Sequence, residues 1–235
     1  MPAPVTITRE QSRQVDRRAV EEYGMSSLVL MENAGRGVVD KIFELGFTGR
    51  VLVCCGKGNN AGDGFVIARH LDLRGAPVTV SLWSEVAELS ADARVNHDIL
   101  ARSCVPIARH GALFDAEALA RETKGAGLIV DALLGTGARG AARFPFDRVI
   151  VALNASSIPI IAVDLPSGFD CDLGAIDSPI IRACHTCTFV AAKRGFLTRG
   201  SSDYIGQAHV LDIGAPRKLV EEILREAAAD PPPSK

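Results

Sequence analysis

The stretch VLVCCGKGNNAGDGFVIARHL, residues 51–71, decides the fold class. It begins with an uncharged, strand-forming run over residues 51–55, passes through a glycine-rich loop and continues with helical periodicity. Strand, loop and helix in this order are typical of a nucleotide-binding α/β unit. Gly56, Gly58, Gly62 and Gly64 would let the backbone adopt positive φ and come close to a ligand, and we expect the helix to begin near Gly64. Its free N–H groups would then face an anion or a carbonyl.

The loop matches neither of the two common phosphate-binding motifs. No Lys-Ser or Lys-Thr pair follows the last glycine, and residues 59–61 break the G-x-G-x-x-G spacing. The loop instead carries oxygen-bearing side chains, those of Asn59, Asn60 and Asp63. The alternative interpretation is an ordinary turn in which Asp63 caps the helix.

Composition limits the class of protein. The 235 residues, 47% of them hydrophobic and 22 of them glycine, suit one α/β domain, which we expect over residues 1–230 with a proline-rich tail over residues 231–235. A net charge of −2 with scattered basic residues indicates no binding of nucleic acid or of an anionic membrane. Because the N-terminus lacks a secretory pattern, we expect a cytoplasmic protein whose partners are small molecules or copies of itself.

The six cysteines are spaced irregularly. Cys54 and Cys55 lie in an expected strand, where small buried thiols are common. Cys184 and Cys187 have the spacing of a metal or redox pair, but no second pair accompanies them, and a strand would turn them to opposite faces. The pattern therefore favours reduced structural thiols.

Strand and helix patterns alternate along the chain. Two helices precede the first strand, one over about residues 9–22, which a capping box of Thr8 and Gln11 would start, and one from residue 27 onward. They could cover the sheet edge, line the pocket or make a dimer contact. The pattern predicts a Rossmann-like three-layer α/β/α sandwich with a central, mostly parallel sheet and extra N-terminal helices. The later strands are expected over residues 78–83, 105–107, 128–131, 158–164, 186–191 and 208–213, and the later helices over residues 65–75, 90–103, 115–124, 145–155 and 217–229.

Two further apolar strands end in an aspartate followed by small residues: IVD at 129–131 and AVD at 162–164. Parallel strands place their carboxyl ends on one edge, so Asp63, Asp131 and Asp164 should lie near one another. Clustered carboxylates are costly unless a cation or hydrogen-bond donors offset their charge. Oxygen ligands favour potassium, sodium or magnesium over zinc. The alternative is that Asp131 only accepts N–H bonds from the Gly135 loop.

Five motifs in order resemble the YjeF N-terminal domain family, the NAD(P)H-hydrate epimerases: LMENAG (30–35), VLVCCGKGNNAGDG (51–64), IVDALLGTG (129–137), AVDLPSGFD (162–170) and TFVAAKRG (188–195). The resemblance runs to about residue 214. It implies interconversion of the R and S forms of hydrated NADH or NADPH, called NAD(P)HX, so that an ATP- or ADP-dependent NAD(P)HX dehydratase can restore the S form. No dehydratase segment follows, so we expect the stand-alone form or a chain cut in a proline-rich linker. The resemblance and the small residues Ala34, Gly35 and Gly37 also suggest a homodimer.

The resemblance implies a set of site residues. A potassium ion, one per subunit, would be held around Asn60, Asp131 and Ser167. Ala61 stands where the family commonly has glycine, so the loop backbone differs if that position needs positive φ. The implied substrate-binding residues are Asn59, Asn60, Ala61, Gly62, Asp63, Gly135, Thr136, Gly137, Ala138, Arg139, Gly140, Ala141 and Asp164.

The expected chemistry occurs at the hydrated carbon beside the ring nitrogen. The nitrogen lone pair would expel hydroxide, and water would attack the iminium-like species from either face with acid–base help. Asp164 is the first candidate for this role and Asp63 the second. Lys193 could stabilise the diphosphate or the leaving hydroxide, or it could be a solvated strand-end lysine. The competing hypothesis is a non-catalytic YjeF-like module for ligand binding or dimerisation.

Overall fold

The computed structural model describes residues 5–229. The expected domain end at residue 230 and the proline-rich tail lie outside these residues. The helices are α1 (Arg9–Tyr23), α2 (Ser27–Glu44), α3 (Asn59–Leu73), α4 (Ala91–Leu100), α5 (Ala116–Thr123), α6 (Phe146–Ala155), α7 (Ser202–Ile205) and α8 (Arg217–Ala229). The strands are β1 (Thr6–Ile7), β2 (Arg50–Cys55), β3 (Val78–Leu82), β4 (Ile107–Arg109), β5 (Ala126–Ala132), β6 (Ile160–Val163), β7 (His185–Phe189), β8 (Ala192–Lys193) and β9 (Gln207–Leu211).

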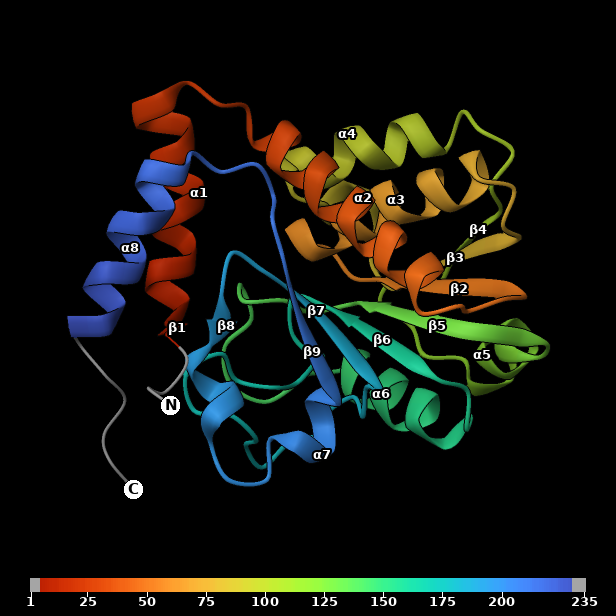
Figure 1. Ribbon diagram of the computed structural model, residues 1–235. Coiled ribbons are helices and arrows are strands. Elements are labelled where there is room, and N and C mark those ends of the chain that lie inside the picture. The colour runs from red at the N-terminus through yellow and green to blue at the C-terminus, as the bar shows by residue number, and fades with distance from the viewer. Residues whose placement is uncertain (1–4, 230–235) are drawn as a thin grey trace.

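A seven-stranded sheet forms the centre, with the order β4-β3-β2-β5-β6-β7-β9 (Figure 1). Every neighbouring pair in it is parallel. Helices α2, α3 and α4 lie on one side of the sheet, and α5 and α6 lie on the other. The arrangement confirms the predicted Rossmann-like α/β/α sandwich.

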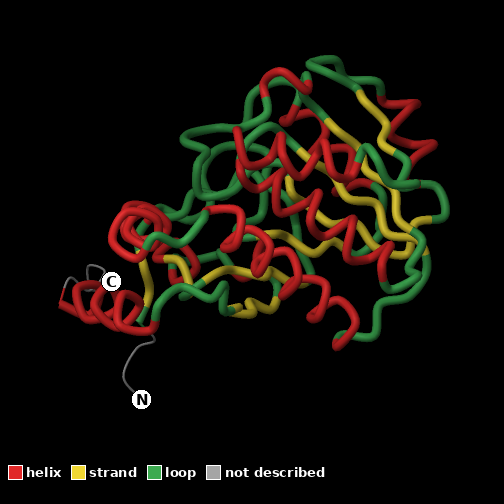
Figure 2. Tube along the Cα trace, turned by 90° about the horizontal axis from the view of Figure 1, so that it is seen from above, coloured by secondary structure: helices red, strands yellow, loops and turns green. Residues whose placement is uncertain are grey.

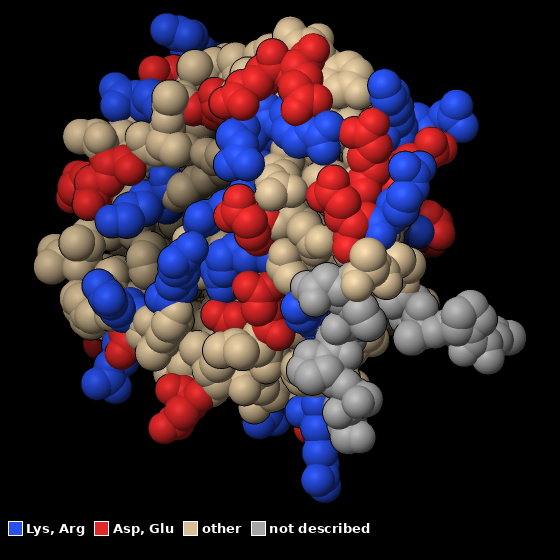
Figure 3. Space-filling model, turned by 90° about the vertical axis from the view of Figure 1, so that its left-hand side faces the viewer, with Lys and Arg blue, Asp and Glu red and all other residues tan. Residues whose placement is uncertain are grey.

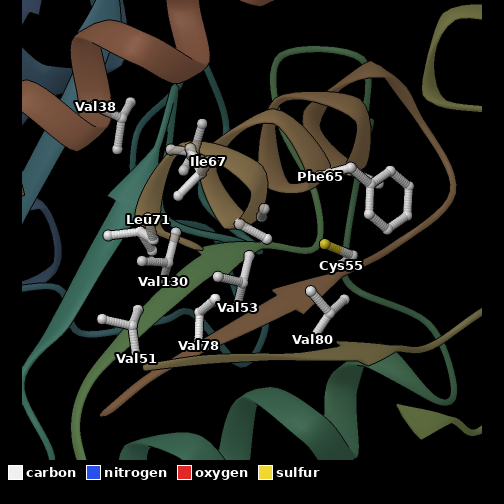
Figure 4. Close-up of a cluster of buried hydrophobic side chains, with 14 of the residues drawn as sticks. Val38, Val51, Val53, Cys55, Phe65, Ile67, Leu71, Val78, Val80 and Val130 are labelled. Atoms are coloured by element: carbon white, nitrogen blue, oxygen red, sulfur yellow. The ribbon is translucent and has the colours of Figure 1, made fainter. Parts of the chain in front are cut away.

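Alternation along β2 divides the core between the two faces of the sheet. Val51, Val53 and Cys55 pack in the cluster beneath α2, α3 and α4 (Figure 4). Leu52 and Cys54 pack in the second cluster, with α5 and α6. A strand buried on both faces reads as a continuous apolar run, which is why residues 51–55 indicated a central strand.

The extra helices take different places. α2 covers the sheet together with α3, whereas α1 lies beside α8 at one end of the molecule (Figures 1 and 2). A capping box of Thr8 and Gln11 starts α1, as the sequence predicted. Val15 and Ala19 of α1 pack with Leu219 and Ile223 of α8 in a cluster of their own. The short strands β1 and β8 pair beside this cluster and were not predicted.

The start of α3 differs from the prediction. The helix begins at Asn59, with Gly58 as its N-cap, and not near Gly64. Gly56, Gly58, Gly62 and Gly64 all lack the expected positive φ. Asp63 lies inside the helix, so it is not a cap.

Close packing explains three of the four glycines. A Cβ on Gly64 would lie 2.6 Å from the Cys55 sulfur, one on Gly62 would lie 2.5 Å from the Met31 sulfur, and one on Gly56 would clash with the Leu133 carbonyl. Gly62 and Gly64 therefore let α3 approach α2 and the sheet closely, and Gly56 lets the end of β2 approach the loop after β5. Gly58 has nothing nearby.

The small residues of α2 are used within the chain. A Cβ on Gly35 would lie 2.5 Å from Val66 of α3, and one on Gly37 would lie 3.5 Å from Leu211 of β9. Ala34 packs in the cluster of α1 and α8. This face therefore gives no support to the dimer that it suggested.

The surface around α1 and α8 carries both signs of charge. Seen from that side, lysine and arginine alternate with aspartate and glutamate, with no field of one sign (Figure 3). Within residues 5–229, no helix has both the length and the apolar character needed to cross a membrane.

Candidate active site

A cavity of about 480 Å³ lies where the strand order reverses. β2 and β5 are neighbours there, but the chain leaves β2 toward β3 on one side and returns to β5 on the other. Parallel α/β proteins bind ligands at this switch point, outside the carboxyl ends of the strands. The predicted substrate residues that line the cavity are Asn59, Asn60, Asp63, Gly135, Thr136, Gly137, Ala138 and Asp164.

The other predicted substrate residues do not line this cavity. Ala61 lies in α3 with a fully buried side chain, so it needs no positive φ and packs in the core as an ordinary helical residue. Gly62 follows it in the helix. Arg139, Gly140 and Ala141 form the exposed outer part of the second loop.

Asn60 is a buried polar residue without partners. Its side chain is 7% exposed, and neither its oxygen nor its nitrogen has a hydrogen bond within the described part of the chain. It lines the cavity beside Gly135, where an added Cβ would lie 3.2 Å from the Asn60 oxygen. A buried amide left unpaired costs roughly 1–3 kcal/mol, so this side chain indicates a ligand that would pair with it.

Asp131 lies in β5 and is fully buried. Its carboxylate accepts hydrogen bonds from the Ser167 hydroxyl at 2.6 Å, the Ser167 N–H at 2.8 Å and the Leu133 N–H at 3.3 Å. Burial raises the pKa of Asp131 to about 6, although the bonds from Ser167 act to lower it. The N–H donors come from Leu133 and Ser167 and not from Gly135. Ser167 also accepts from the Leu134 N–H at 2.9 Å, so these residues join the loops after β5 and β6.

Asp164 directly follows β6 and has a φ of +65°, which is unusual for a residue other than glycine. Its Oδ2 accepts from the Thr136 N–H at 2.9 Å and from the Thr136 hydroxyl at 2.5 Å. Its Oδ1 lies 3.4 Å from the Lys193 ammonium. The carboxylate is therefore fixed at the cavity wall by partners on two sides.

Lys193 is fully buried, so the interpretation as a solvated strand-end lysine is wrong. Its ammonium donates to the carbonyls of Phe189 at 2.8 Å and Ala191 at 3.3 Å. It does not line the cavity. The structure thus places Lys193 behind Asp164, where its charge acts on that carboxylate.

Two more carboxylates face the cavity. Asp63 is 9% exposed, and burial raises its pKa well above the usual range, with the charges of Asp164 and Asp16 adding to the effect. The surroundings of Asp63 therefore favour its protonated form. Asp16 enters from α1, and enclosure by protein atoms raises its pKa to about 6, with Asp164 raising it further and Lys193 lowering it. Asp16 itself is exposed to solvent, unlike Asp63 and Asp164.

Sequence reasoning missed Asp16, and it also missed Arg9. The Arg9 guanidinium is buried, donates to the Thr136 carbonyl at 2.6 Å and to the Ala138 carbonyl, and pairs with Asp170 at 2.8 Å. Its backbone N–H donates to Asp172 at 2.8 Å. Arg9 thereby ties the second substrate loop to the start of α1. No local pattern distinguishes it from the exposed arginines of the same helix.

Cys54 and Cys55 are buried, as predicted. Cys54, Cys55 and Cys187 are buried free thiols, whereas Cys184 is exposed and donates to the Ile160 carbonyl at 3.1 Å. Among the described residues, no three His, Cys, Asp or Glu side chains come together as a metal site. The predicted potassium site would also use amide and hydroxyl oxygens, from Asn60 and Ser167 beside Asp131, so the absence of such a cluster does not test it.

Comparison with known proteins agrees with this geometry. The model of the family described as "YjeF-related protein N-terminus" matches residues 27–195. An NAD(P)H-hydrate epimerase from Pirellula staleyi is 45% identical over 215 residues, covering 92% of this chain and 95% of that protein. The crystal structure of the yeast protein ynu0, YNL200c, superimposes with a TM-score of 0.77 at 26% identity and covers 93% of each chain.

A bifunctional NAD(P)H-hydrate repair enzyme, Nnr, from Moorella thermoacetica is also similar, at 41% identity over 222 residues. The match spans 91% of this chain but only 41% of that longer enzyme.

Fold and cavity together define a Rossmann-like α/β protein with a carboxylate-lined ligand site at the switch point. The chain belongs to the YjeF-related protein N-terminus family, as its five motifs predicted. Arg9 and Asp16 lie before the matched residues, so a search for family motifs alone passes over them.

Proposed function

We propose that this chain interconverts the R and S forms of NADHX and NADPHX in the repair of hydrated nicotinamide cofactors. Relatives from Pirellula staleyi and Rhodopirellula baltica, 45% and 40% identical and similar in length, are named NAD(P)H-hydrate epimerase. The observation that carries the proposal is the Asp164 carboxylate, which lines the cavity and is fixed by Thr136 with Lys193 behind it.

The reaction needs proton transfer at one carbon. The lone pair of the ring nitrogen expels the hydroxyl group, the C–O bond breaks, and water adds to the resulting iminium from either face. A group beside the carbon must give a proton to the departing oxygen, and a group must take one from the attacking water. Asp164 is the primary acid–base candidate. Asp63, whose protonated form is favoured by burial, can donate a hydrogen bond to the substrate.

The diphosphate of the substrate would lie at the start of α3. The first N–H groups of a helix are free and carry partial positive charge, which favours anions. Lys57 and Arg13 line the same cavity and add positive charge to it. The second loop, at residues 135–138, would close on the other side of the substrate.

A potassium ion fits the residues around Asn60, Asp131 and Ser167. The unpaired Asn60 oxygen and the buried Asp131 carboxylate are hard ligands, and burial of Asp131 is less costly when a cation neutralises it. When bound, the ion would supply positive charge to the carboxyl edge and hold the loops. The chain's own contribution is to orient the Asp131 carboxylate, which Ser167 does by donating its N–H and its hydroxyl to it.

Further parts of the proposal concern partners and location. Relatives with the name of a bifunctional repair enzyme match this chain over about two-fifths of their length, which supports coupling to an NAD(P)HX dehydratase. We also propose a homodimer, on the family resemblance alone. The free thiols Cys104 and Cys184 are exposed, and exposed reduced cysteines suit the cytoplasm.

Chiral separation of NADHX epimers with and without the protein tests this function. We expect purified R hydrate to approach the equilibrium mixture faster with the protein than in its absence, and an added S-specific dehydratase to consume all of it. Equal rates with and without the protein, over several potassium concentrations, would point instead to a non-catalytic module for ligand binding or dimerisation.

A further inference from the structure

Asp16 lines the cavity from α1 and not from the strand ends. α1 contributes Ser12, Arg13 and Asp16 to the lining, and Ser12 and Asp16 are four residues apart on one helix face. Arg9 fixes the start of this helix against the second substrate loop, and the cluster with α8 fixes the remainder. Asp16 is thus carried on a rigid element.

The Asp16 carboxylate has no structural task that the contacts reveal. Within residues 5–229 it makes neither a hydrogen bond nor an ion pair, whereas Arg18 of the same helix pairs with Glu22 at 2.7 Å and with Glu222 at 2.7 Å. Asp16 also lines a smaller adjoining cavity of about 100 Å³, so it stands between two hollows. An unpaired carboxylate in such a position is free to act on a ligand.

A separate observation indicates that a ligand occupies this space. The Asn60 amide is more than nine-tenths buried, has no partner and lines the same cavity as Asp16. A polar side chain in this condition requires a partner from outside the chain. The carboxylate and the amide thus face one compartment built to receive a polar molecule.

Epimerisation at one carbon requires proton transfer on two faces of the ring. Hydroxyl leaves from one face and water arrives on the other, so one group cannot serve both steps without moving around the ring. Asp164 reaches the cavity from the end of β6, whereas Asp16 reaches it from α1, so the two carboxylates come from separate elements of the lining. We propose, resting on the epimerase function proposed above, that Asp16 is a second catalytic acid–base residue, which serves the ring face opposite to Asp164.

The step balances without any further reactant. The protonated carboxyl on one wall gives its proton to the departing hydroxyl as the nitrogen lone pair breaks the C–O bond, which releases water. The carboxylate on the other wall takes a proton from a second water molecule as the oxygen of that water bonds to the iminium carbon. The ring nitrogen recovers its lone pair, and the reverse direction exchanges the two roles.

The electrostatic surroundings of Asp16 suit a carboxyl group that gains and loses a proton during the reaction. Enclosure and the charge of Asp164 raise the pKa of Asp16 to about 6, against the lowering effect of Lys193. An acid–base group works best when its pKa is near the working pH. The charged and titratable groups that line the two cavities or act on Asp16 are Arg13, Lys57, Asp63, Asp92, Asp164 and Lys193.

The test compares Asp16→Asn with Glu21→Gln, a matched change on an exposed part of the same helix outside both cavities. Rates of R-NADHX conversion are measured by chiral separation as kcat and KM over pH 5–9, with melting curves for each protein. We expect kcat to fall about 10²–10⁴-fold in Asp16→Asn with KM changed less than about threefold. A limb of the wild-type profile near pH 6 should also disappear.

A second variant keeps the test decisive. Asp16→Ala leaves space for a small acid, and added formate should restore part of its kcat but should not affect Glu21→Gln. If wild type accelerates conversion and Asp16→Asn matches it within about threefold, or if formate rescues nothing, the role of Asp16 is overturned. If wild type itself does not accelerate conversion, the epimerase function fails, and the Asp16 proposal fails with it.

Discussion

The ends of β5 and β6 share a sequence pattern but differ in environment. Both strands run from apolar residues into an aspartate, yet Asp131 is sealed in the core while Asp164 opens to the cavity. Strand register explains the difference, because Asp131 pairs with Ala162. Asp164 therefore lies two residues further toward the edge, about 7 Å at ~3.3 Å per residue. A shift of two residues along the strand therefore separates Asp131, which joins two loops, from Asp164, which can contact a substrate.

The largest effect should come from Asp164→Asn. The amide keeps the shape but cannot carry the acid–base proton, so we expect kcat for R-NADHX to fall about 10²–10⁴-fold. The melting temperature should fall as well, because buried Lys193 loses the charge of its partner although Thr136 can still donate to the amide oxygen, so rates are compared at a temperature where both proteins are folded. Coupling to a purified S-specific dehydratase measures the rate. An unchanged kcat would remove Asp164 from the mechanism and end the contrast with Asp131.

Asp131→Ala should act on stability first. Three buried donors, from Ser167 and Leu133, lose their acceptor, and we expect a loss of about 3 kcal/mol in the free energy of unfolding. The variant should also lose any stabilisation by potassium. Urea denaturation in potassium chloride and in tetramethylammonium chloride measures both. Equal stability of wild type in the two salts would leave Asp131 as a residue that only binds Ser167 and Leu133.

Arg9→Met should affect the substrate loop more than the core. Loss of the guanidinium leaves the Thr136 and Ala138 carbonyls without a donor and Asp170 without its cation. We therefore expect the free energy of unfolding to fall by about 2 kcal/mol and KM to rise several-fold. Arg17→Met, at an exposed position of the same helix with a weak 3.8 Å contact to Glu10, is the matched control and should change stability by less than about 0.5 kcal/mol. Equal behaviour of the two variants would show that Arg9 does not position the loop.

Thr136→Val should have the smallest effect. The change removes the hydrogen bond from the Thr136 hydroxyl to Asp164 but keeps the one from the backbone N–H. We therefore expect the activation free energy to rise by about 1 kcal/mol, which is a roughly fivefold fall in kcat. Steady-state kinetics at saturating R-NADHX measures this. A loss as large as that of Asp164→Asn would mean that the hydroxyl itself takes part in proton transfer.

The sequence predicted what depends on local pattern. The apolar runs, the capping box at Thr8 and the glycine-rich turn were enough for the order of elements and for the edge that carries the site. The start of α3 was placed wrongly because glycines were interpreted as turn residues, whereas Gly62 and Gly64 serve close packing of a helix. That distinction depends on neighbours such as Met31 and Cys55, which local spacing does not specify.

Residues that act over long separations stayed hidden. Arg9 meets Thr136, 127 positions later, and no periodicity of α1 reports such a contact. Asp16 likewise faces Asp164 only because α1 docks against α8. The burial of Lys193 had no local signal either, because a lysine at a strand end is usually solvated.

The central claim is that Asp164, which lines the cavity, catalyses exchange of the substrate's hydroxyl group with solvent, whereas the buried Asp131 does not. Labelled water tests this claim most directly. R-NADHX is incubated in ¹⁸O-water with wild type, Asp164→Asn or Asp131→Asn under conditions where each protein is folded. The S hydrate is then separated, and its ¹⁸O content is measured by mass spectrometry. We expect the label to enter the S hydrate at the rate of epimerisation with wild type, at a similar rate with folded Asp131→Asn in saturating potassium, and only at the uncatalysed rate with Asp164→Asn. Epimerisation without label, or full labelling by Asp164→Asn, would contradict the account.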